Sequence, residues 1–386
     1  MKSVYMDKKE CCGCTACEKI CNLKAIRMEK DKEGFFYPVI NEDICIDCGQ
    51  CRKVCPLNKE ENKENTIDKL IIYAVKHKEE NERMNSSSGG MYTALSNYVL
   101  NKNGVVAGVK FNEEFEVIHE CTNSEMGRNE FRGSKYVKSN LKNVYFEIKQ
   151  ELENGKIVLF TGTPCEVAGL KNYISLSRVN SDKLILNDII CHGAPSPKIW
   201  ESYIKFIDKK RILKKFVFRA KEKGWRGYNI KAVYADNKIK INSPKLKSFT
   251  YLFSSDLPLR PSCYSCKFAK VKRCSDIMIG DFWGIEKSIP EMDDNKGTSL
   301  VFINTEKGNR IFEDIKDVIE YKSCTINDCM QPNLYKSTSM PSNREEFWND
   351  FSKYGYKYIA NKYGRYNVRG KIKITISNIL RDMKIL

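Results

Sequence analysis

The sequence is poor in histidine and has no long hydrophobic run. Its three histidines are His77, His119 and His192, and only His192 lies beside a candidate site, next to Cys191. A Cys–His hydrolytic pair is therefore unattractive. No apolar run approaches the ~18 residues that a membrane helix needs, and the first residues, MKSVYMDKKE, lack the apolar core of a signal peptide. We expect a cytoplasmic protein.

Acidic residues are also in short supply. The chain of 386 residues has 66 Lys and Arg against 49 Asp and Glu, which gives a formal net charge of +17. The excess is greatest over residues 351–386, where Asp382 is the only acidic residue beside nine basic ones. A basic surface attracts acidic partners, anionic cofactors or anionic lipid, so the charge alone leaves these three classes open.

Cysteine, in contrast, is abundant, with 17 in the chain. Disulfides are rare in the cytoplasm, so this number indicates metal binding or redox chemistry. The spacing C-x2-C-x2-C-x3-C occurs between Cys11 and Cys21 and again between Cys45 and Cys55. In such a run three thiolates bind one 4Fe-4S cluster and the fourth binds the other cluster. Zinc sites usually use two separated pairs instead.

The repeat predicts two N-terminal 4Fe-4S clusters, and residues 1–60 resemble a bacterial two-cluster ferredoxin. Asn22 stands where the pattern usually has proline. Cys12 is an additional thiol that fits a free cysteine better than a ligand, although it could replace Cys11. Charged residues then predict a solvated linker over 61–70. The expected ligands are Cys11, Cys14, Cys17 and Cys55 for one cluster, and Cys45, Cys48, Cys51 and Cys21 for the other.

Beyond residue 70, short apolar runs alternate with helical patterns. Ser139 is predicted to cap a helix whose apolar residues run from Leu141 to Leu152. Other helices are expected to begin near residues 91, 165 and 197. The alternation indicates α/β organisation. The predicted strands cover 71–75, 104–111, 116–120, 157–160 and 184–190.

Two loops could bind a phosphate or a planar ring. Residues 86–90, SSSGG, precede a predicted helix, where small residues and free N–H groups favour an anion. An ordinary helix cap is the alternative. Residues 131–139, FRGSKYVKS, place Arg132, Lys135 and Lys138 around Tyr136, which suits a diphosphate and a stacked ring. A solvated basic loop is equally compatible with that composition.

Further cysteines lie in the predicted α/β body. Cys165 and Cys191 follow two of the predicted strands, and parallel pairing would bring both thiols to the edge where α/β sheets place ligands. Cys263 and Cys266 form a C-x2-C pair that could hold zinc, with Cys274 nearby. Together, the strand-end thiols and the pair are enough for a third cubane. A helix N-terminus at Cys165 would favour a thiolate in any role, including that of a nucleophile.

Several motifs in order carry a resemblance to a known family. They are SSSGG, GSKY, TGTPCEVAGLK, NDIICHGAPSP, RPSCYSCKFAK, SDIMIGDFWGI and KGTSLVFINTEKG. From about residue 71 to 325, the chain resembles coenzyme F420 hydrogenase/dehydrogenase beta subunits, which commonly carry a ferredoxin-like front end. The resemblance implies a flavin, usually FAD, beside a 4Fe-4S cluster. Related members reduce the deazaflavin coenzyme F420, or reduce chlorophyll-type pigments with ferredoxin.

The resemblance also assigns roles to residues. It implies cluster ligation by Cys165, Cys191, Cys263 and Cys266, with Cys274 as a rival to Cys165 or Cys191. Asp281 is a weaker candidate for the flavin pocket. FMN is not distinguished from FAD by the residues. The implied flavin contacts are Ser86, Ser87, Ser88, Gly89, Gly90, Lys135 and Tyr136, and more loosely Thr161 and Thr163.

We expect an α+β or α/β chain in which a small ferredoxin-like two-cluster domain precedes an α/β body that binds flavin and iron–sulfur. The boundaries are 1–60 for the ferredoxin-like domain, 61–70 for the linker, 71–150 and 151–325 for the two parts of the body, and 326–386 for a basic C-terminal extension. The second part of the body would hold the third cluster.

The expected function is that of an iron–sulfur flavoprotein oxidoreductase. Electrons would pass between a ferredoxin-like donor, the clusters and the flavin, which exchanges hydride with a small-molecule acceptor. One alternative is a beta subunit with coenzyme F420 as the hydride partner. The other is a non-catalytic electron-transfer subunit of a larger redox complex. Expected partners are an acidic electron-transfer protein such as ferredoxin, or another redox subunit.

The tail mixes tyrosines with basic residues over 354–373, but no recognised nucleic-acid fold accompanies it, so nucleic acid is not an expected partner. We expect the tail to dock on the body of the chain. Contact with an acidic partner or an anionic membrane surface is the alternative. A predicted helix face there comprises Ile372, Ile376, Ile379, Leu380 and Met383, with Lys373, Arg381 and Lys384 outside it.

Overall fold

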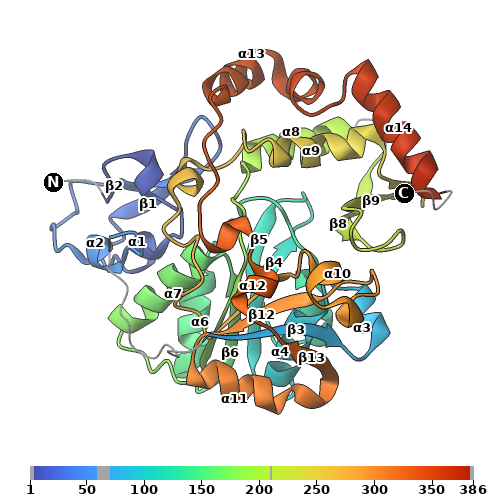
Figure 1. The fold of residues 1–386 in the computed structure, drawn as a ribbon. Helices are drawn as coiled ribbons and strands as arrows, with labels where there is room; N and C mark the ends of the chain where they lie inside the picture. Colours follow the sequence, from blue (N-terminus) through green and yellow to red (C-terminus); the bar gives the residue numbers. More distant parts are fainter. Residues whose placement is uncertain (1–3, 59–69, 209–210, 383–386) are drawn as a thin grey trace.

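The computed structural model describes residues 4–58, 70–208 and 211–382. Its centre is an eight-stranded mixed sheet in the order β13-β3-β12-β11-β7-β6-β4-β5 (Figure 1). The middle strands β4, β6, β7 and β11 are parallel, and the remaining neighbours pair antiparallel. The strands are β3 (Ile71–His77), β4 (Val105–Phe111), β5 (Val117–Thr122), β6 (Val158–Gly162), β7 (Leu184–Ile189), β11 (Ile277–Asp281), β12 (Ser299–Ile303) and β13 (Ile319–Ser323).

Helices cover both faces of this sheet, which explains why its central strands are apolar throughout. Alternate side chains of β6 enter different cores, because successive residues of a strand point to opposite faces. Val158 and Phe160 pack with α6 (Val144–Glu153) and α7 (Pro164–Leu176), whereas Leu159 packs with α4 (Met91–Leu100) and α11 (Glu306–Asp314). The expected α/β class is confirmed.

One helix start differs from the sequence prediction. Ser139 does not cap α6, which begins five residues later with Asn143 at its N-cap. The Ser139 hydroxyl instead donates to the buried Glu166 carboxylate at 3.1 Å. Leu141 is still buried, so its apolar character reflects packing of the loop and not the helix. The predicted linker over 61–70 lies almost wholly outside the described residues.

The N-terminal unit contains a hairpin and two short helices. Strands β1 (Ile26–Lys30) and β2 (Phe36–Ile40) pair antiparallel. Helices α1 (Ala16–Lys19) and α2 (Gln50–Val54) pack together and against α7 (Figure 1). Two contacts fix the unit on the body: the Asn172 amide donates to the Val54 carbonyl at 3.1 Å, and the Lys267 ammonium donates to the Leu57 carbonyl at 2.7 Å.

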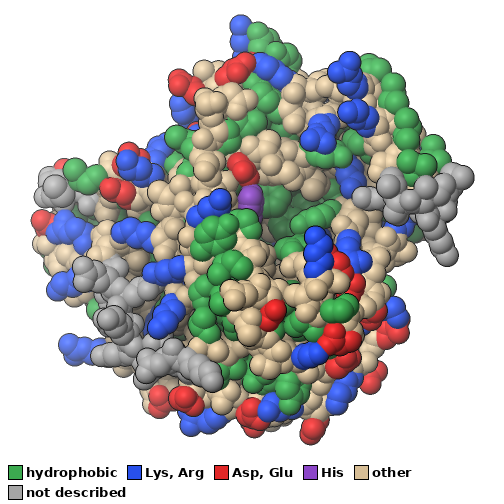
Figure 2. Space-filling view, in the orientation of Figure 1, with side chains coloured by type: hydrophobic (Ala, Val, Ile, Leu, Met, Phe, Trp, Pro, Cys, Tyr) green, Lys and Arg blue, Asp and Glu red, His purple; other side chains and the backbone are tan. Residues whose placement is uncertain are grey.

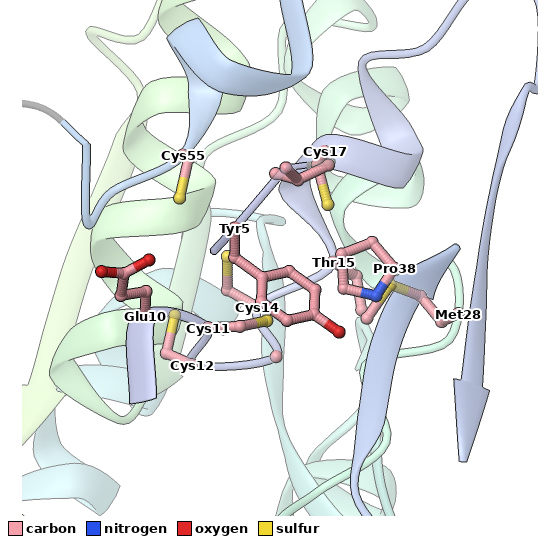
Figure 3. A pocket seen from close by; sticks show the side chains of 12 residues that line it. Tyr5, Glu10, Cys11, Cys12, Cys14, Thr15, Cys17, Met28, Pro38 and Cys55 are labelled. Atoms are coloured by element: carbon pink, nitrogen blue, oxygen red, sulfur yellow. The ribbon is translucent and has the colours of Figure 1, made fainter. Parts of the chain in front are cut away.

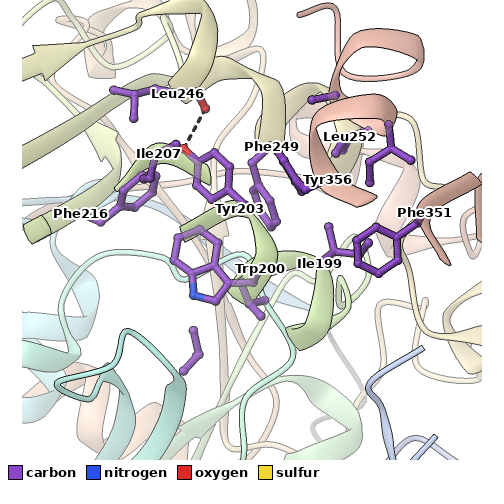
Figure 4. Close-up of a cluster of buried hydrophobic side chains, with 14 of the residues drawn as sticks. Ile199, Trp200, Tyr203, Ile207, Phe216, Leu246, Phe249, Leu252, Phe351 and Tyr356 are labelled. Atoms are coloured by element: carbon purple, nitrogen blue, oxygen red, sulfur yellow. Dashed lines mark hydrogen bonds between the residues drawn. The ribbon is translucent and has the colours of Figure 1, made fainter. Parts of the chain in front are cut away.

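A second sheet, which the sequence patterns did not predict, lies beside the first. It contains β8 (Leu213–Ala220), β9 (Asn229–Tyr234) and β10 (Ile239–Ile241), all antiparallel. An aromatic core packs between this sheet, α8 (Pro197–Ile207), α9 (Pro244–Ser254) and α13 (Arg344–Lys362) (Figure 4). Trp200 and Tyr203 lie at its centre, and the Tyr203 hydroxyl donates to the Leu246 carbonyl at 3.0 Å.

The tail forms a helix that docks on the body. α14 (Val368–Asp382) packs against α9, where Ile374 is buried and the Asn378 amide donates to the Asn242 carbonyl at 2.9 Å. Met383 and Lys384 lie outside the described residues. Within the described ranges, no helix has the length and apolarity to cross a bilayer. The remaining helices are α3 (Glu80–Met84), α5 (Glu125–Phe131), α10 (Ile285–Ser288) and α12 (Ile326–Cys329).

Candidate iron–sulfur and cofactor site

The two cysteine runs share an unusual backbone. Gly13 and Thr15 in the first run have positive φ, and so do Asp47 and Gly49 at the same positions of the second run. Non-glycine residues adopt this left-handed conformation rarely, so its repetition marks a specific loop shape. Alternating left-handed residues turn successive N–H groups toward one side, which creates a cradle for negative charge.

The first run and the end of the second line a common cavity of about 340 Å³ (Figure 3). It is lined by Cys11, Cys14, Cys17 and Cys55, the four residues expected to bind one cluster. Cys14 and Cys17 are buried, and burial contributes to a raised pKa of both thiols. The position of Cys55 supports the prediction that the fourth cysteine of one run reaches the cluster of the other.

The other four N-terminal cysteines lie at the outer side of the unit. Cys51 is in α2 and Cys21 follows α1, so the packing of these helices brings the two runs together. The backbone N–H of Ala25 donates to the Cys21 sulfur at 3.3 Å. Cys48 is exposed, in contrast to the buried thiols of the first cavity. The expected second cluster would therefore lie near solvent.

A second cavity, of about 650 Å³, lies in the body and is lined by Cys165, Cys191, Cys263 and Cys266. Strands β6 and β7 are parallel, as expected, and Cys165 and Cys191 follow their carboxyl ends. The C-x2-C pair reaches the same cavity from a short 3-10 helix, Pro261–Ser265. The structure thus brings together all four cysteines predicted for the third cluster, and it adds Cys12 to the lining.

Local contacts set the position of these thiols. Thr163 and Glu166 form a capping box at the start of α7, with Pro164 at the first turn, which fixes Cys165 at the helix N-terminus. The Thr163 hydroxyl lies 3.3 Å from the Cys165 sulfur. The backbone N–H of Ala194 donates to the Cys263 sulfur at 3.4 Å. Hydrogen bonds to sulfur of this kind stabilise and tune cluster thiolates.

The charge of the body cavity fits a cationic occupant. Burial raises the pKa of Cys191 and Cys266 and raises that of Cys263 to about 12. Contact with Cys12, together with burial, also raises the pKa of Cys165. Four thiolates can therefore coexist here only with a metal charge beside them.

The spacing of the thiols favours a cluster over a single ion. Within the described ranges, no three His, Cys, Asp or Glu side chains lie close enough to hold one metal ion. Zinc requires its sulfur ligands within about 2.3 Å of a common centre. In a cubane each thiolate binds a different iron, so the sulfurs stand further apart. The donor set fits a 4Fe-4S cluster.

Arg260 joins the two cavities. It lines the body cavity, and its guanidinium donates to the Cys11 carbonyl at 2.7 Å and to the Phe36 carbonyl at 3.0 Å. It also lies 3.4 Å from the Cys11 sulfur. Arg260 is fully buried, yet its Nη1 has no hydrogen-bond partner. An unpaired buried cation is costly unless a negative group lies beside it, which fits anionic clusters.

The remaining cysteines divide clearly. Cys12 lines both cavities and its thiol contacts Cys14 and Cys165, a position that the sequence did not predict. Cys274, the rival ligand, is absent from the lining of the body cavity and packs with the core under α7. Cys324 and Cys329 contact one another elsewhere.

A row of aromatic side chains begins at the body cavity. His192 lines that cavity, and its Nε2 lies 2.6 Å from Asp256 Oδ1. The His192 ring packs edge-on against Phe253, and Phe253 stacks on Tyr136, the ring predicted to contact a flavin. Phe253 belongs to α9, and Figure 2 shows this face of the molecule hollowed between α9 and α10.

Arg219 continues this row on the side of β8. Its guanidinium forms an ion pair with Asp281 at 3.0 Å and lies over the rings of Tyr228 and Trp283 at 4.5 and 5.0 Å. Trp283 in turn stacks between Tyr228 and Trp225. We call Phe253, Tyr136, Tyr228 and Trp283, together with Arg219, the aromatic row. It offers flat apolar faces beside a buried positive charge.

The loops predicted to bind phosphate meet next to this row. Ser134 of the GSKY motif donates through its backbone N–H to the Ser87 hydroxyl at 2.7 Å. The hydroxyls of Ser86 and Ser88 donate to the carbonyls of Glu82 and Thr298. All three serine hydroxyls of the SSSGG loop are therefore engaged within the protein, so any role in phosphate binding falls to its backbone.

Two buried lysines lie close to these loops. The Lys221 ammonium donates to the Ser88 carbonyl at 2.6 Å, and that of Lys135 donates to the Glu130 carbonyl at 2.7 Å. Burial lowers the pKa of each to about 7. A cation held without a carboxylate partner in its hydrogen bonds suits an anionic ligand. Thr161 and Thr163 lie instead on the Cys165 side, where Thr161 accepts from Asn187 at 3.1 Å.

The sequence analysis missed Arg219, Lys221, Trp225 and Tyr228. A signal was present, because residues 217–229, VFRAKEKGWRGYN, combine basic and aromatic residues. It was not interpretable alone, since only the second sheet brings this stretch to the GDFWG and GSKY motifs.

Comparison with known proteins supports this geometry. Residues 155–328 match the family model of the C-terminal part of coenzyme F420 hydrogenase/dehydrogenase beta subunits, and residues 10–59 match the 4Fe-4S dicluster domain. Residues 155–328 thus belong to the family of coenzyme F420 hydrogenase/dehydrogenase beta subunits. The resemblance inferred from the sequence is confirmed, and the N-terminal unit is a 4Fe-4S domain.

Among individual proteins, the F-type component of the F420H2 dehydrogenase of Methanosarcina mazei is 21% identical over 324 residues, which cover 80% of this chain and 83% of that protein. An uncharacterised ferredoxin of Methanocaldococcus jannaschii is 40% identical over 45 residues, 12% of this chain and 24% of that protein. A chain of the F420-reducing NiFe hydrogenase complex of Methanosarcina barkeri has 17% identity and a TM-score of 0.47, covering 79% of this chain and 94% of that chain.

The family match distinguishes between the expected functions. It favours the alternative of a coenzyme F420 beta subunit over a separate flavoprotein oxidoreductase. The chain is an iron–sulfur protein of a redox family.

Proposed function

We propose that the chain is an electron-transfer subunit that connects one-electron chemistry at 4Fe-4S clusters with hydride chemistry on coenzyme F420 or a related small molecule. The observation that carries the proposal is the convergence of Cys165, Cys191, Cys263 and Cys266 on one cavity beside the N-terminal cysteine cavity. The family match and the aromatic row support the same assignment.

The arrangement of cysteines proposes an order of electron transfer. The cluster of Cys21, Cys45, Cys48 and Cys51 would exchange electrons with a partner, because Cys48 is exposed. The cluster of Cys11, Cys14, Cys17 and Cys55 would come next. The body cluster would follow, since Cys12 contacts residues of both cavities. The partner would be another redox subunit or an acidic electron-transfer protein, because the chain is strongly basic.

A flavin, FAD or FMN, would lie along the aromatic row, and it would supply the exchange between single electrons and hydride. Tyr136 and Trp283 would stack on its ring, and Arg219 would hold it against a negative charge. Lys221 and the SSSGG backbone would bind its phosphates. Asp256 would orient the His192 imidazole at the end of the row nearest the cluster.

Iron content tests the cluster assignment. Three cubanes predict about 12 iron atoms per chain in anaerobically prepared protein and about 8 in Cys165→Ala. Cys274→Ala is the matched control, because Cys274 does not line the cavity, and it should retain about 12. Unchanged iron in Cys165→Ala would reject the body cluster and return Cys165 to a nucleophilic or redox thiol.

Ligand binding tests the aromatic row separately. Arg219→Met should weaken binding of FAD and of coenzyme F420 at least roughly tenfold, about 1.4 kcal/mol, because it removes the buried charge. Arg226→Met, a neighbouring exposed arginine, should leave both affinities unchanged. Equal binding by both variants would show that the row is structural, and iron content would remain as an independent measure of the clusters.

A further inference from the structure

The outer face of α14 carries an apolar stripe that nothing in the described parts of the chain covers. Val368, Ile372, Ile376 and Ile379 are between 51% and 74% exposed, although each is strongly apolar. Their spacing places them on one side of the helix. The opposite side is the docked one, with Ile374 buried against the body. The stripe therefore remains free while α14 stays folded against α9.

Basic residues flank this stripe. Arg369 and Lys373 are exposed on one side of it, and the Lys371 ammonium on the other side lies 3.9 Å from the Tyr366 ring centre. Asp382, the last residue of α14, is the only acidic residue of the helix. Figure 2 shows hydrophobic side chains along the edge formed by α14, with Lys and Arg gathered beside them over α13.

The neighbouring helix adds interfacial aromatics. After its kink at Gly355, α13 continues beside α14 with Tyr358 exposed, and Tyr354 just before the kink is exposed as well. The two rings lie 4.6 Å apart, next to the exposed Lys353 and Lys357. Tyrosines and lysines at this depth are typical of protein surfaces that lie at the boundary between lipid headgroups and acyl chains.

We propose that α14 and the exposed tyrosines of α13 bind the surface of an anionic phospholipid bilayer. The apolar stripe would enter the headgroup–acyl boundary, and the flanking Arg369 and Lys373 would contact lipid phosphates. This occupant matches both properties of the face at once, and it needs no pocket on a convex helix. A second copy of the chain fits less well, because residues 351–386 carry a net charge of +8 and would repel one another.

Vesicle flotation of the full-length, cluster-loaded protein tests this binding. The protein should float with phosphatidylglycerol–phosphatidylcholine vesicles and not with phosphatidylcholine alone, and salt should weaken the binding by screening. Ile372→Gln with Ile376→Gln should weaken it at least roughly tenfold, and Arg369→Glu with Lys373→Glu should do the same. Ile212→Gln with Ile239→Gln removes two equally exposed isoleucines elsewhere and should have no effect.

Circular dichroism and iron content, unchanged in every variant, would show that the fold survives. Absence of binding to anionic vesicles would overturn the proposal, as would binding that is indifferent to Ile372→Gln with Ile376→Gln. If that variant instead dissociates a dimer in sedimentation, or releases an acidic partner protein while vesicles never bind, the stripe is a protein interface and the lipid assignment is wrong.

Discussion

Arg260 shows how much a single side chain can determine at this site. Its guanidinium contacts the first cysteine run through Cys11 and lines the cavity of the body, and one of its nitrogens is unpaired. A fixed positive charge stabilises the more negative, reduced form of a nearby cluster. The residue therefore acts on two predicted clusters from one position.

We expect Arg260→Met to lower the reduction potentials of these two clusters, by on the order of 50 mV, and to leave that of the outer cluster unchanged. Arg260→Lys keeps the charge and should cause a smaller shift. Redox titration followed by electron paramagnetic resonance measures all three. A uniform shift of the three potentials, or none, would contradict a direct effect of the guanidinium.

Residue types in the sequence identified the N-terminal ligands, because their spacing alone specifies a cluster. The body cavity was less accessible. Cys165 and Cys274 could not be ranked until the parallel pairing of β6 and β7 separated them. Cys12 could not be placed at all, because its role depends on how the N-terminal unit packs against α7. Contacts between distant segments are not written in local patterns.

At the scale of elements, the loop between α3 and α4 illustrates a different constraint. A Cβ on Gly89 would lie 2.1 Å from the Val75 carbonyl oxygen and 2.5 Å from the Ser299 nitrogen. Both atoms are backbone of neighbouring strands and cannot move independently. Gly89 thus lets the loop lie flat against β3 and β12, which holds the SSSGG segment in place.

Gly89→Ala should lower the free energy of unfolding by about 3 kcal/mol or more. Gly133→Ala is its control: Gly133 also lies in a candidate phosphate loop, at φ +82°, but open space surrounds its Cβ position. It should cost only about 1 kcal/mol. Urea unfolding compares the two. Equal losses would mean that the backbone contact at Gly89 is relieved by movement of the loop.

The alternation of strands and helices predicted β3 to β7 and most of their helices, because apolar runs with turn residues between them were clear. The second sheet was missed. Its strand β8 mixes lysines with phenylalanines, and the paired strands β8 and β9 contain register shifts, so period-two alternation is broken. The aromatic row rests on that sheet, and so most of it was missed as well.

For the whole molecule, the N-terminal unit depends on the body at several points. The Arg344 guanidinium, at the start of α13, binds both carboxylate oxygens of Glu33 in the β1–β2 hairpin. Both side chains are nearly buried. A residue near the end of the chain thus fixes the position of one near its beginning.

Glu33→Ala would leave the Arg344 charge without its partner and should destabilise the protein by about 3 kcal/mol. Hydrogen exchange should rise in β1 and β2 before it rises in the large sheet, because the docking of the hairpin is what weakens. Glu29→Ala, an exposed acid of the same hairpin, should change neither quantity by much. Uniform exchange across both units would argue against independent loosening of the hairpin.

The wall between the two cysteine cavities has a consequence for how such a protein can be built. Cys12 and Leu57, both from the N-terminal unit, close one side of the body cavity. A body produced without residues 1–58 would leave that side open to water and dissolved oxygen. The two parts are therefore not interchangeable modules on a string. Each serves as the other's shield, so they have to be inherited, expressed and matured as one.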